Sequence, residues 1–163
     1  MKTIVCVDNN WGIGNANDLL YHIPDDMKFF KEKTVGNVVV MGLATLKSFP
    51  GEAPLKDRVN IVLCDDKSFH RDDVIICDSL ESLFTCLERY KTDSVYVIGG
   101  ASVYAQLLPY CDTAYVTKVN DSKPADKYFP NLDENEDWVC VRESESFDYK
   151  GTEYKFTKYR TVE

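Results

Sequence analysis

Short apolar runs rich in β-branched residues recur along the whole chain, and they constrain the fold more than any other feature. Runs such as VVVM and VYVIGG are continuously apolar, which is typical of strands buried on both faces of a parallel sheet. Because helical patterns lie between them, we expect an α/β domain with a single, mainly parallel central sheet flanked by about four helices. The expected strands are Thr3–Val7, Val38–Met41, Val59–Leu63, Val74–Cys77, Ser94–Ile98 and Thr113–Val119.

The clearest helical pattern follows the fourth of these strands. Its apolar residues fall at i, i+3, i+4 and i+7, at positions Leu80, Leu83, Phe84 and Leu87. Asp78 and Glu81 are expected to form a capping box at its N-terminus. A second helix is expected over Ala101–Leu108, where Pro109 stops it.

The C-terminal part of the chain has a different pattern. Trp138–Glu143 and Tyr154–Tyr159 are expected to be two antiparallel strands joined around Lys150–Gly151, as a hairpin at the edge of the sheet. The sequence contains no internal repeat, low-complexity tract or Pro/Gly-rich linker. Since 163 residues suit one domain, a single domain over residues 1–163 is expected.

The net charge of −8 bears on partners and location. An acidic surface disfavours non-specific binding to nucleic acid and anionic membranes. The N-terminus lacks a signal-peptide core, and no apolar run approaches the roughly 20 residues that span a bilayer. We therefore expect a cytoplasmic protein without nucleic-acid or membrane partners. A monomer is expected because no unusual apolar surface stripe remains once the core is assigned.

The six cysteines are scattered, with neither a C-x-x-C pair nor a His at ligand spacing. Most lie inside apolar runs, where a free thiol behaves as a small hydrophobe. We expect no metal site and no disulfide. The cysteines are Cys6, Cys64, Cys77, Cys86, Cys111 and Cys140.

An acidic pair follows a proline in the segment Ile23–Lys31. This order is typical of a helix start. Asp26 is expected on the inward, apolar stripe of that helix together with Met27 and Phe30. Asp25 lies about 100° away and should face water. A carboxylate on an apolar face needs a cation or a ligand as partner, although a simple N-terminal helix acid would show the same residues.

Two glycines, Gly99 and Gly100, lie between an expected strand and an expected helix. Glycine allows close approach of the backbone to a phosphate, and a helix N-terminus presents free N–H groups to it. A tight strand-to-helix turn without a ligand would look the same.

The segment Asn9–Leu19 follows the first strand and is rich in Gly and Asn. It is unsuited to a helix and long for a passive connection, so we expect a mobile lid over a site.

These segments, in this order and spacing, resemble the dihydrofolate reductase family. Each motif is weak alone, but six in order cover nearly the whole chain. They are the lid, Ile23–Lys31 (L-P-x-D/E-x-x-x-F-K), Met41–Ser48 (M-G-R-x-T-x-x-S), Leu55–Asn60 (within P-L-x-x-R-x-N), Ile98–Tyr104 (I-G-G-x-x-V-Y) and Asp126–Pro130 (D-x-x-F-P).

The resemblance implies reduction of 7,8-dihydrofolate to tetrahydrofolate by hydride transfer from a nicotinamide cofactor, and binding of antifolate inhibitors. It implies that Asp26 binds the 2-amino group and N3 of the pterin and assists protonation at N5. Thr117 matches the threonine that links this acid to the pterin. Tyr21 replaces the usual Trp after the lid, so an altered water contact is expected.

The remaining substrate contacts are also carried over from the family. Arg58 matches the arginine that clamps the α-carboxylate of the folate glutamate, a task that suits the guanidinium fork. A surface arginine would be the alternative. The residues expected to line the slot are Ile4, Val5, Met27, Phe30, Phe49, Ile98 and Tyr104.

The resemblance assigns most cofactor contacts to the lid and to the ends of strands, and it implies a cis peptide between Gly99 and Gly100. The expected cofactor-binding residues are Cys6, Ile13, Gly14, Asn17, Leu19, Gly42, Leu43, Ala44, Thr45, Leu63, Cys64, Asp65, Asp78, Gly99, Gly100, Ala101, Ser102, Val103 and Tyr104.

The chain departs from the family where the cofactor 2′-phosphate is usually bound. Leu43 and Ser102 stand in place of frequent basic residues, and acids follow two strands at Asp65, Asp66 and Asp78. Such acids repel a phosphate but accept from a ribose 2′-OH. NADPH is the first expectation, because Lys67, His70 or Arg71 could compensate, and NADH is the alternative.

Two other readings are compatible with parts of the pattern. A pteridine or pyrimidinone reductase of the same fold would keep the cofactor cradle but would not need Asp26 together with Arg58. A non-catalytic nucleotide-binding module would need no acid facing the nicotinamide and would show no turnover.

Overall fold

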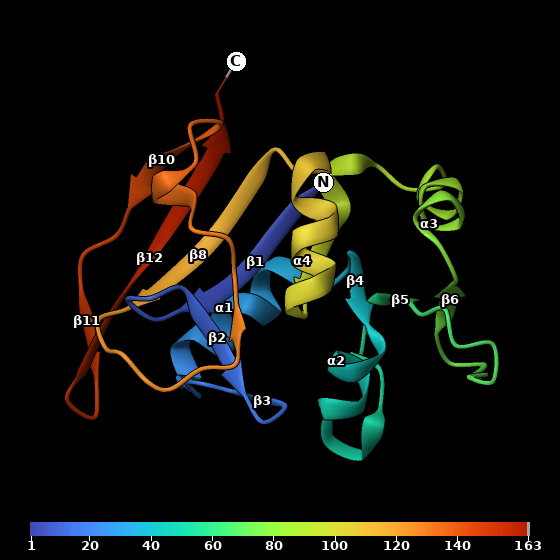
Figure 1. Ribbon diagram of the computed structural model, residues 1–163, viewed down its shortest axis with the longest axis horizontal. Coiled ribbons are helices and arrows are strands. Elements are labelled where there is room, and N and C mark those ends of the chain that lie inside the picture. Colours follow the sequence, from blue (N-terminus) through green and yellow to red (C-terminus); the bar gives the residue numbers. More distant parts are fainter. Residues whose placement is uncertain (163) are drawn as a thin grey trace.

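A largely parallel sheet forms the centre of the molecule in the computed structural model, which describes residues 1–162 (Figure 1). Within these residues the strand order is β10-β12-β8-β1-β7-β4-β5-β6, and β11 pairs with β12. Strands from β8 to β6 in this order are parallel, whereas β10, β11 and β12 are antiparallel to their neighbours. The bounds are β1 Lys2–Val7, β4 Val38–Gly42, β5 Val59–Leu63, β6 Ile75–Cys77, β7 Val95–Gly99, β8 Thr113–Val119, β10 Trp138–Glu143, β11 Phe147–Tyr149 and β12 Thr152–Thr161.

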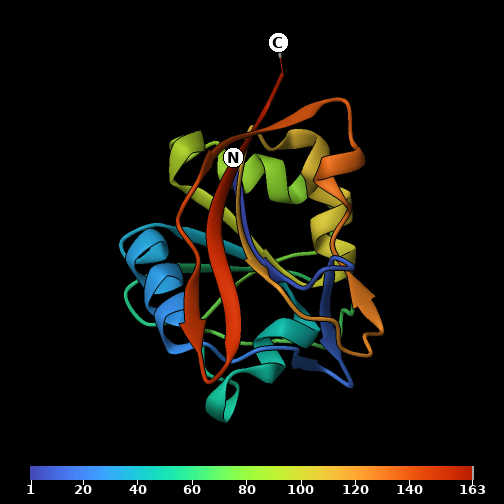
Figure 2. The ribbon, with the colours of Figure 1, turned by 90° about the vertical axis from the view of Figure 1, so that its left-hand side faces the viewer.

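Helices cover both faces of this sheet: α1 Pro24–Thr34, α2 Leu43–Ser48, α3 Leu80–Leu87 and α4 Ala101–Leu107. Successive strand residues point to opposite faces. Val40 therefore joins a core cluster with Leu83 of α3 and Leu107 of α4, while Met41 joins one with Leu46 of α2. Figure 2 shows α1 and α4 on opposite sides of the sheet. The expected α/β class, with a mainly parallel sheet and about four helices, is confirmed.

The short helix α2 depends on tertiary contacts. A helix of one to two turns is unstable alone in water. Leu46 is fully buried against Val39 and Met41 of β4, which anchors α2 beside the carboxyl end of that strand. Truncating such a leucine costs about 2–5 kcal/mol.

A strand overlaps each run expected to form a central strand, with bounds that differ by at most one residue at either end, and two of them, Val59–Leu63 and Thr113–Val119, match to the residue. The expected capping box at α3 was wrong. Ser79 is the N-cap and exchanges hydrogen bonds with Ser82, while the Asp78 carboxylate only accepts from the Ser82 hydroxyl. The helix therefore begins two residues after Asp78.

The C-terminal hairpin differs in detail from the expectation. The turn at Lys150–Gly151 joins β11 to β12, and not β10 to β12. The strand β12 lies between β8 and the outer edge, which β10 and β11 form along different parts of β12. A separate short strand, Phe147–Tyr149, was not expected.

The segment expected to be a lid loop contains a hairpin instead. Strands β2 (Gly12–Asn15) and β3 (Asp18–Leu19) pair, and β9 (Lys127–Tyr128) completes a small antiparallel sheet. Ala16 and Asn17 both have positive φ, 51° and 64°, as a two-residue type I′ turn requires. Tight turn geometry thus permits strand pairing in a Gly- and Asn-rich segment.

No helix in the part of the chain that the structure describes is long and apolar enough to cross a membrane. Short 3₁₀ helices occur at Pro50–Glu52, Thr92–Ser94, Leu108–Tyr110 and Leu132–Glu134.

Candidate active site

The first turn of α1 brings a carboxylate onto the face of the sheet. Thr117 of β8 donates a hydrogen bond from Oγ1 to Oδ1 of Asp26 over 2.6 Å. Burial raises the pKa of Asp26 above its usual range, while hydrogen bonds from Thr117 and Cys6 act in the opposite direction. A carboxylate with a raised pKa exchanges a proton closer to neutral pH, which suits general acid–base chemistry.

The neighbouring acid and Met27 are placed differently from Asp26. Asp25 is exposed, as expected, and accepts a hydrogen bond from the hydroxyl of Tyr154. Met27 was expected on the inward stripe, and this was wrong: the side chain is 54% exposed. The helix packs on the sheet through Phe29 and Phe30, so Met27 projects from its side.

An apolar strip runs from α1 to α2 across the central strands. Ile4 of β1 forms a cluster against which Phe30 of α1 and Ile98 of β7 pack. Ile98 also packs against the cluster that includes Phe49, the residue after α2. Four of the expected slot residues therefore lie on one face of the sheet, between the two helices.

Two other expected slot residues belong to the opposite face. Val5 packs in the core cluster with α3 and α4, so its side chain lies on the face of the sheet opposite to Asp26. Tyr104 of α4 is buried there too, but its hydroxyl donates to the carbonyl of Ile4 over 2.7 Å. Tyr104 thus ties α4 to the centre of β1.

Arg58 lies near the opposite end of α1 from Asp26. Its Nη1 donates to Oγ1 of Thr34 over 3.0 Å, and its Nε donates to the carbonyl of Lys56. Thr34 is the last residue of α1, roughly 12 Å along the helix axis from Asp26. A carboxylate and a guanidinium at the two ends of one helix suit an elongated ligand with donors at one end and a carboxylate at the other.

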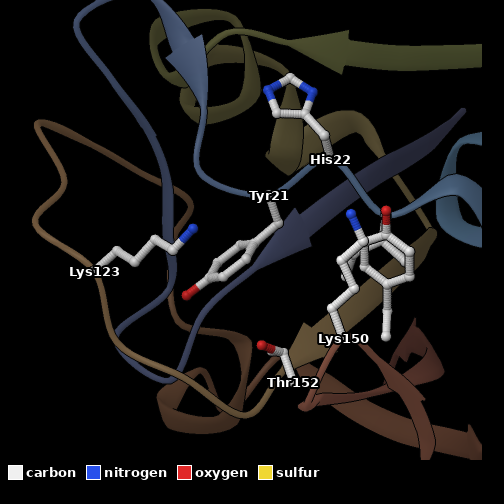
Figure 3. Close-up of a pocket in the computed structure, with 7 residues that line it drawn as sticks. Tyr21, His22, Lys123, Lys150 and Thr152 are labelled. Atoms are coloured by element: carbon white, nitrogen blue, oxygen red, sulfur yellow. The ribbon is translucent and has the colours of Figure 1, made fainter.

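The hydroxyl of Tyr21 is bound by an acid other than Asp26. Its hydroxyl donates to Oδ2 of Asp121 over 3.1 Å, and Nζ of Lys123 lies 4.3 Å from its ring centroid. Figure 3 shows Tyr21 between Lys123 and Lys150 in a small pocket of about 170 Å³. Burial, followed by this hydrogen bond, raises the pKa of Tyr21.

The expected cofactor cradle is formed where β4 and β7 end side by side. A Cβ on Gly42 would lie 3.1 Å from Cγ2 of Val103, and one on Gly100 would lie 3.6 Å from Oγ1 of Thr45. Gly99 has φ +125°, which favours glycine, and the peptide bond between Gly99 and Gly100 is cis, as expected. Glycine therefore lets α4 pack closely against both strand ends, through Val103 at Gly42 and Tyr104 at Gly99, while Gly100 keeps ordinary contact distance to Thr45.

The other expected cofactor residues follow the carboxyl ends of the same parallel strands or lie in the lid. Ile13 and Cys64 are buried in the core, so their side chains are unavailable to a ligand. Asp65 is exposed after β5, and Asp78 is exposed after β6. Gly14 is buried in β2. The remaining expected residues are exposed or half-buried at these strand ends and in the lid: Asn17, Leu19, Leu43, Ala44, Leu63, Ala101 and Ser102.

The base of the lid is held by Asp8, which was not among the residues predicted to be functional. This carboxylate is 3% exposed and accepts from the backbone N–H groups of Asn10, Gly12 and Lys123. Asp126 accepts from the N–H of Ala16 at the tip of the hairpin. The sequence signal that could have identified Asp8 is an Asp directly after a buried strand, with a Gly four residues later.

Within residues 1–162 no group of three or more His, Cys, Asp or Glu side chains could hold a metal ion. The six cysteines are free thiols.

The fold and site define an α/β enzyme for small molecules, in which a carboxylate of raised pKa lies on the sheet face and glycines lie at the ends of two neighbouring parallel strands. Family comparison gives the particular class. The model of the family described as dihydrofolate reductase matches residues 1–161. The chain belongs to the dihydrofolate reductase family, oxidoreductases that reduce dihydrofolate to tetrahydrofolate.

Relatives and a solved structure agree with this membership. The chain is 32% identical to dihydrofolate reductase of Bacillus subtilis, over 96% of this chain and 91% of that one. It is 33% identical to the enzyme of Staphylococcus haemolyticus, over 99% and 96%. A structure of dihydrofolate reductase from Enterococcus faecalis complexed with NADP(H) and RAB-propyl has a TM-score of 0.87 and 30% identity, covering 99% and 96% of the two chains.

Proposed function

We propose that this chain reduces 7,8-dihydrofolate to tetrahydrofolate with NADPH, and that Asp26 binds the pterin and assists protonation at N5. The observation that carries the proposal is the hydrogen-bonded Asp26–Thr117 pair on the face of the sheet. The family membership supports the reaction, and the local geometry supports the assignment of residues to it.

Asp26 suits the pterin because a carboxylate offers two acceptor oxygens to two adjacent donors, the 2-amino group and N3. One oxygen of Asp26 already accepts from Thr117, which orients the carboxylate relative to β8. The raised pKa caused by burial lets the same group take up and return a proton near neutral pH.

At the other end of α1, Arg58 would bind the α-carboxylate of the folate glutamate. Two of its nitrogens are already bound by Thr34 and by the carbonyl of Lys56, which orients the guanidinium. Phe30, Phe49 and Ile98 form the apolar strip between the two ends and would contact the aromatic part of the substrate.

NADPH supplies a hydride from C4 of its nicotinamide when it is bound. Gly42, Gly99 and Gly100 form the ends of β4 and β7, where α4 packs closely against the backbone, and would border the nucleotide there. Thr45 lies next to Gly100 and would orient a phosphate or ribose oxygen. The lid hairpin, held by Asp8 and Asp126, would exclude water from the nicotinamide.

We infer further that the chain is a single-domain, cytoplasmic monomer that binds folates and antifolates, without nucleic-acid or membrane partners. Strands from both ends of the chain, β1 and β12, flank β8 in one sheet, which supports one domain. Six free thiols favour a reducing compartment, and the net charge of −8 disfavours anionic partners.

The test is consumption of reduced nicotinamide with dihydrofolate, measured with NADPH and NADH in parallel on wild type and Asp26→Asn. We expect turnover by the wild type and a loss of about 10²–10⁴-fold in the variant at neutral pH. Asp25→Asn is the matched control and should retain activity, because Asp25 is exposed. Folded wild-type protein without folate-dependent turnover would reject the assignment and favour a related pteridine reductase or a nucleotide-binding module.

A further inference from the structure

The strand residue beside Thr117 carries a thiol toward the same carboxylate. In the parallel pairing of β1 with β8, Cys6 is the register partner of Thr117. Paired residues on neighbouring strands point to the same face of a sheet. Cys6 therefore lies on the α1 side next to Thr117, where it packs beside Ile23, the residue that precedes that helix, and where its thiol is among the groups that lower the pKa of Asp26.

The chemistry of the thiol fixes its role in this contact. Burial, and next the negative charge of Asp26, raise the pKa of Cys6 well above its usual range. The thiol therefore stays protonated through the neutral range, and an S–H group beside a carboxylate is a donor. Cys6 and Thr117 thus present two donors to one carboxylate from adjacent strands.

The other ionisable groups around Asp26 do not replace this donor. Tyr104 of α4 donates to the carbonyl of Ile4, and Tyr154 of β12 donates to Asp25. Burial is the main cause that raises the pKa of both tyrosines, and the charge of Asp26 adds to it, so both hydroxyls stay neutral. Asp25, on the same helix, carries the same negative charge as Asp26 when ionised and then has no proton to donate.

We propose that Cys6 is a positioning residue for the reaction, whose thiol donates to Asp26 next to Thr117 and holds the carboxylate ionised and oriented toward the pterin. The role of Asp26 in this statement rests on the proposed function. The proposed hydrogen bond does not depend on that function, and it can be measured in the enzyme without substrate.

The physical consequence is a shift in the protonation of Asp26. Burial favours the neutral acid, and each hydrogen bond to the ionised form opposes that effect. If the S–H donor is removed, the ionised form loses one partner, and Asp26 takes up its proton at a higher pH. The expected change is about half a pH unit to one unit for one hydrogen bond.

Three substitutions separate the donor from the volume of the side chain. Cys6→Ser keeps a donor, Cys6→Ala removes the donor and the volume, and Cys6→Val fills the space without a donor. Cys111→Ala is the matched control, because Cys111 is a buried thiol hydrogen-bonded to Leu107 in the opposite core. Thermal unfolding and near-ultraviolet circular dichroism identify the variants that fold.

The measurement is the ¹³C NMR titration of the Asp26 carboxyl carbon in the free enzyme, followed by the pH profile of dihydrofolate reduction. We expect both midpoints to move upward by about half a unit or more in Cys6→Ala and Cys6→Val, and to stay near wild type in Cys6→Ser and Cys111→Ala. Midpoints in the folded Ala or Val variant that equal wild type would overturn the proposal, as would a Ser variant that shifts as far as Ala. An NMR shift without turnover in the wild type would reject the proposed function while supporting the hydrogen bond.

Discussion

The hydroxyl of Thr117 and the carboxylate of Asp26 are joined by a 2.6 Å hydrogen bond between β8 and α1, across 91 residues of sequence. This contact connects the strand β8 with the helix α1, which packs on the same face of the sheet. It is also one of two donors that offset the effect of burial on Asp26.

Thr117→Val removes this donor with little change in volume. We expect the pKa of Asp26 to rise and kcat/KM for dihydrofolate at neutral pH to fall about fivefold, as one hydrogen bond of roughly 1 kcal/mol implies. Thr113→Val is the control, because Thr113 is a buried threonine of the same strand whose hydroxyl bonds to Asp112. Equal rates for Thr117→Val and wild type would show that the hydroxyl does not orient the acid.

Asp26→Asn should stabilise the fold at neutral pH. The folded-state pKa of Asp26 is raised, so the unfolded state ionises first as pH rises from acid. The carboxylate therefore destabilises the fold in a window that opens at the ordinary pKa of 3.8, and the penalty is complete above the folded-state pKa. We expect a gain of roughly 1 kcal/mol by urea unfolding at pH 7, vanishing near pH 3. A variant that is no more stable than Asp25→Asn at neutral pH would contradict this.

Gly42→Ala should destabilise the protein through contact with one methyl group. The added Cβ would lie 3.1 Å from Cγ2 of Val103, while φ of −85° at Gly42 is compatible with alanine. We expect a loss of about 1–3 kcal/mol in urea unfolding, together with weaker NADPH binding. The double variant Gly42→Ala/Val103→Ala should recover part of the stability, and strictly additive losses would argue against this contact.

Arg58→Gln should affect the substrate and not the chemistry of the pterin. We expect KM for dihydrofolate to rise about 30–150-fold with kcat nearly unchanged, since a charge-assisted pair of about 2–3 kcal/mol is lost. A reduced pterin substrate without the glutamate provides the control, because it has no carboxylate for Arg58 to bind. If both substrates respond equally, Arg58 acts through Thr34 and the end of α1 instead.

The acids at the ends of β5 and β6 should influence cofactor preference. Asp65→Ser and Asp78→Ser remove negative charges near the expected position of the 2′-phosphate, so the ratio of kcat/KM for NADPH over NADH should rise about fivefold, or about 1 kcal/mol. Glu88→Gln, which removes an exposed charge just after α3, is the control. An unchanged ratio would place the phosphate elsewhere.

Much of the framework follows from local pattern. Val59–Leu63 and Thr113–Val119 were identified to the residue, because continuous apolar runs have few alternatives to a buried parallel strand. Asp26 was identified as an acid on an otherwise apolar helix face. Thr117 and Arg58 came only from family resemblance, since neither is unusual in its own segment.

Side-chain direction was less predictable. Met27 projects into solvent because α1 packs on the sheet through Phe29 and Phe30, and helical spacing alone did not distinguish these neighbouring faces. Val5 points to the opposite face from Ile4 because β1 alternates, although both residues lie in the same apolar run.

The sequence by itself determined the α/β class, most strands and the acid that the fold places on the sheet face, because these depend on spacing within a few residues. Only the tertiary structure decided that Cys6 lies next to Thr117, the residue that donates to Asp26. That arrangement depends on the register between β1 and β8, and a shift of one residue would turn either side chain to the opposite face.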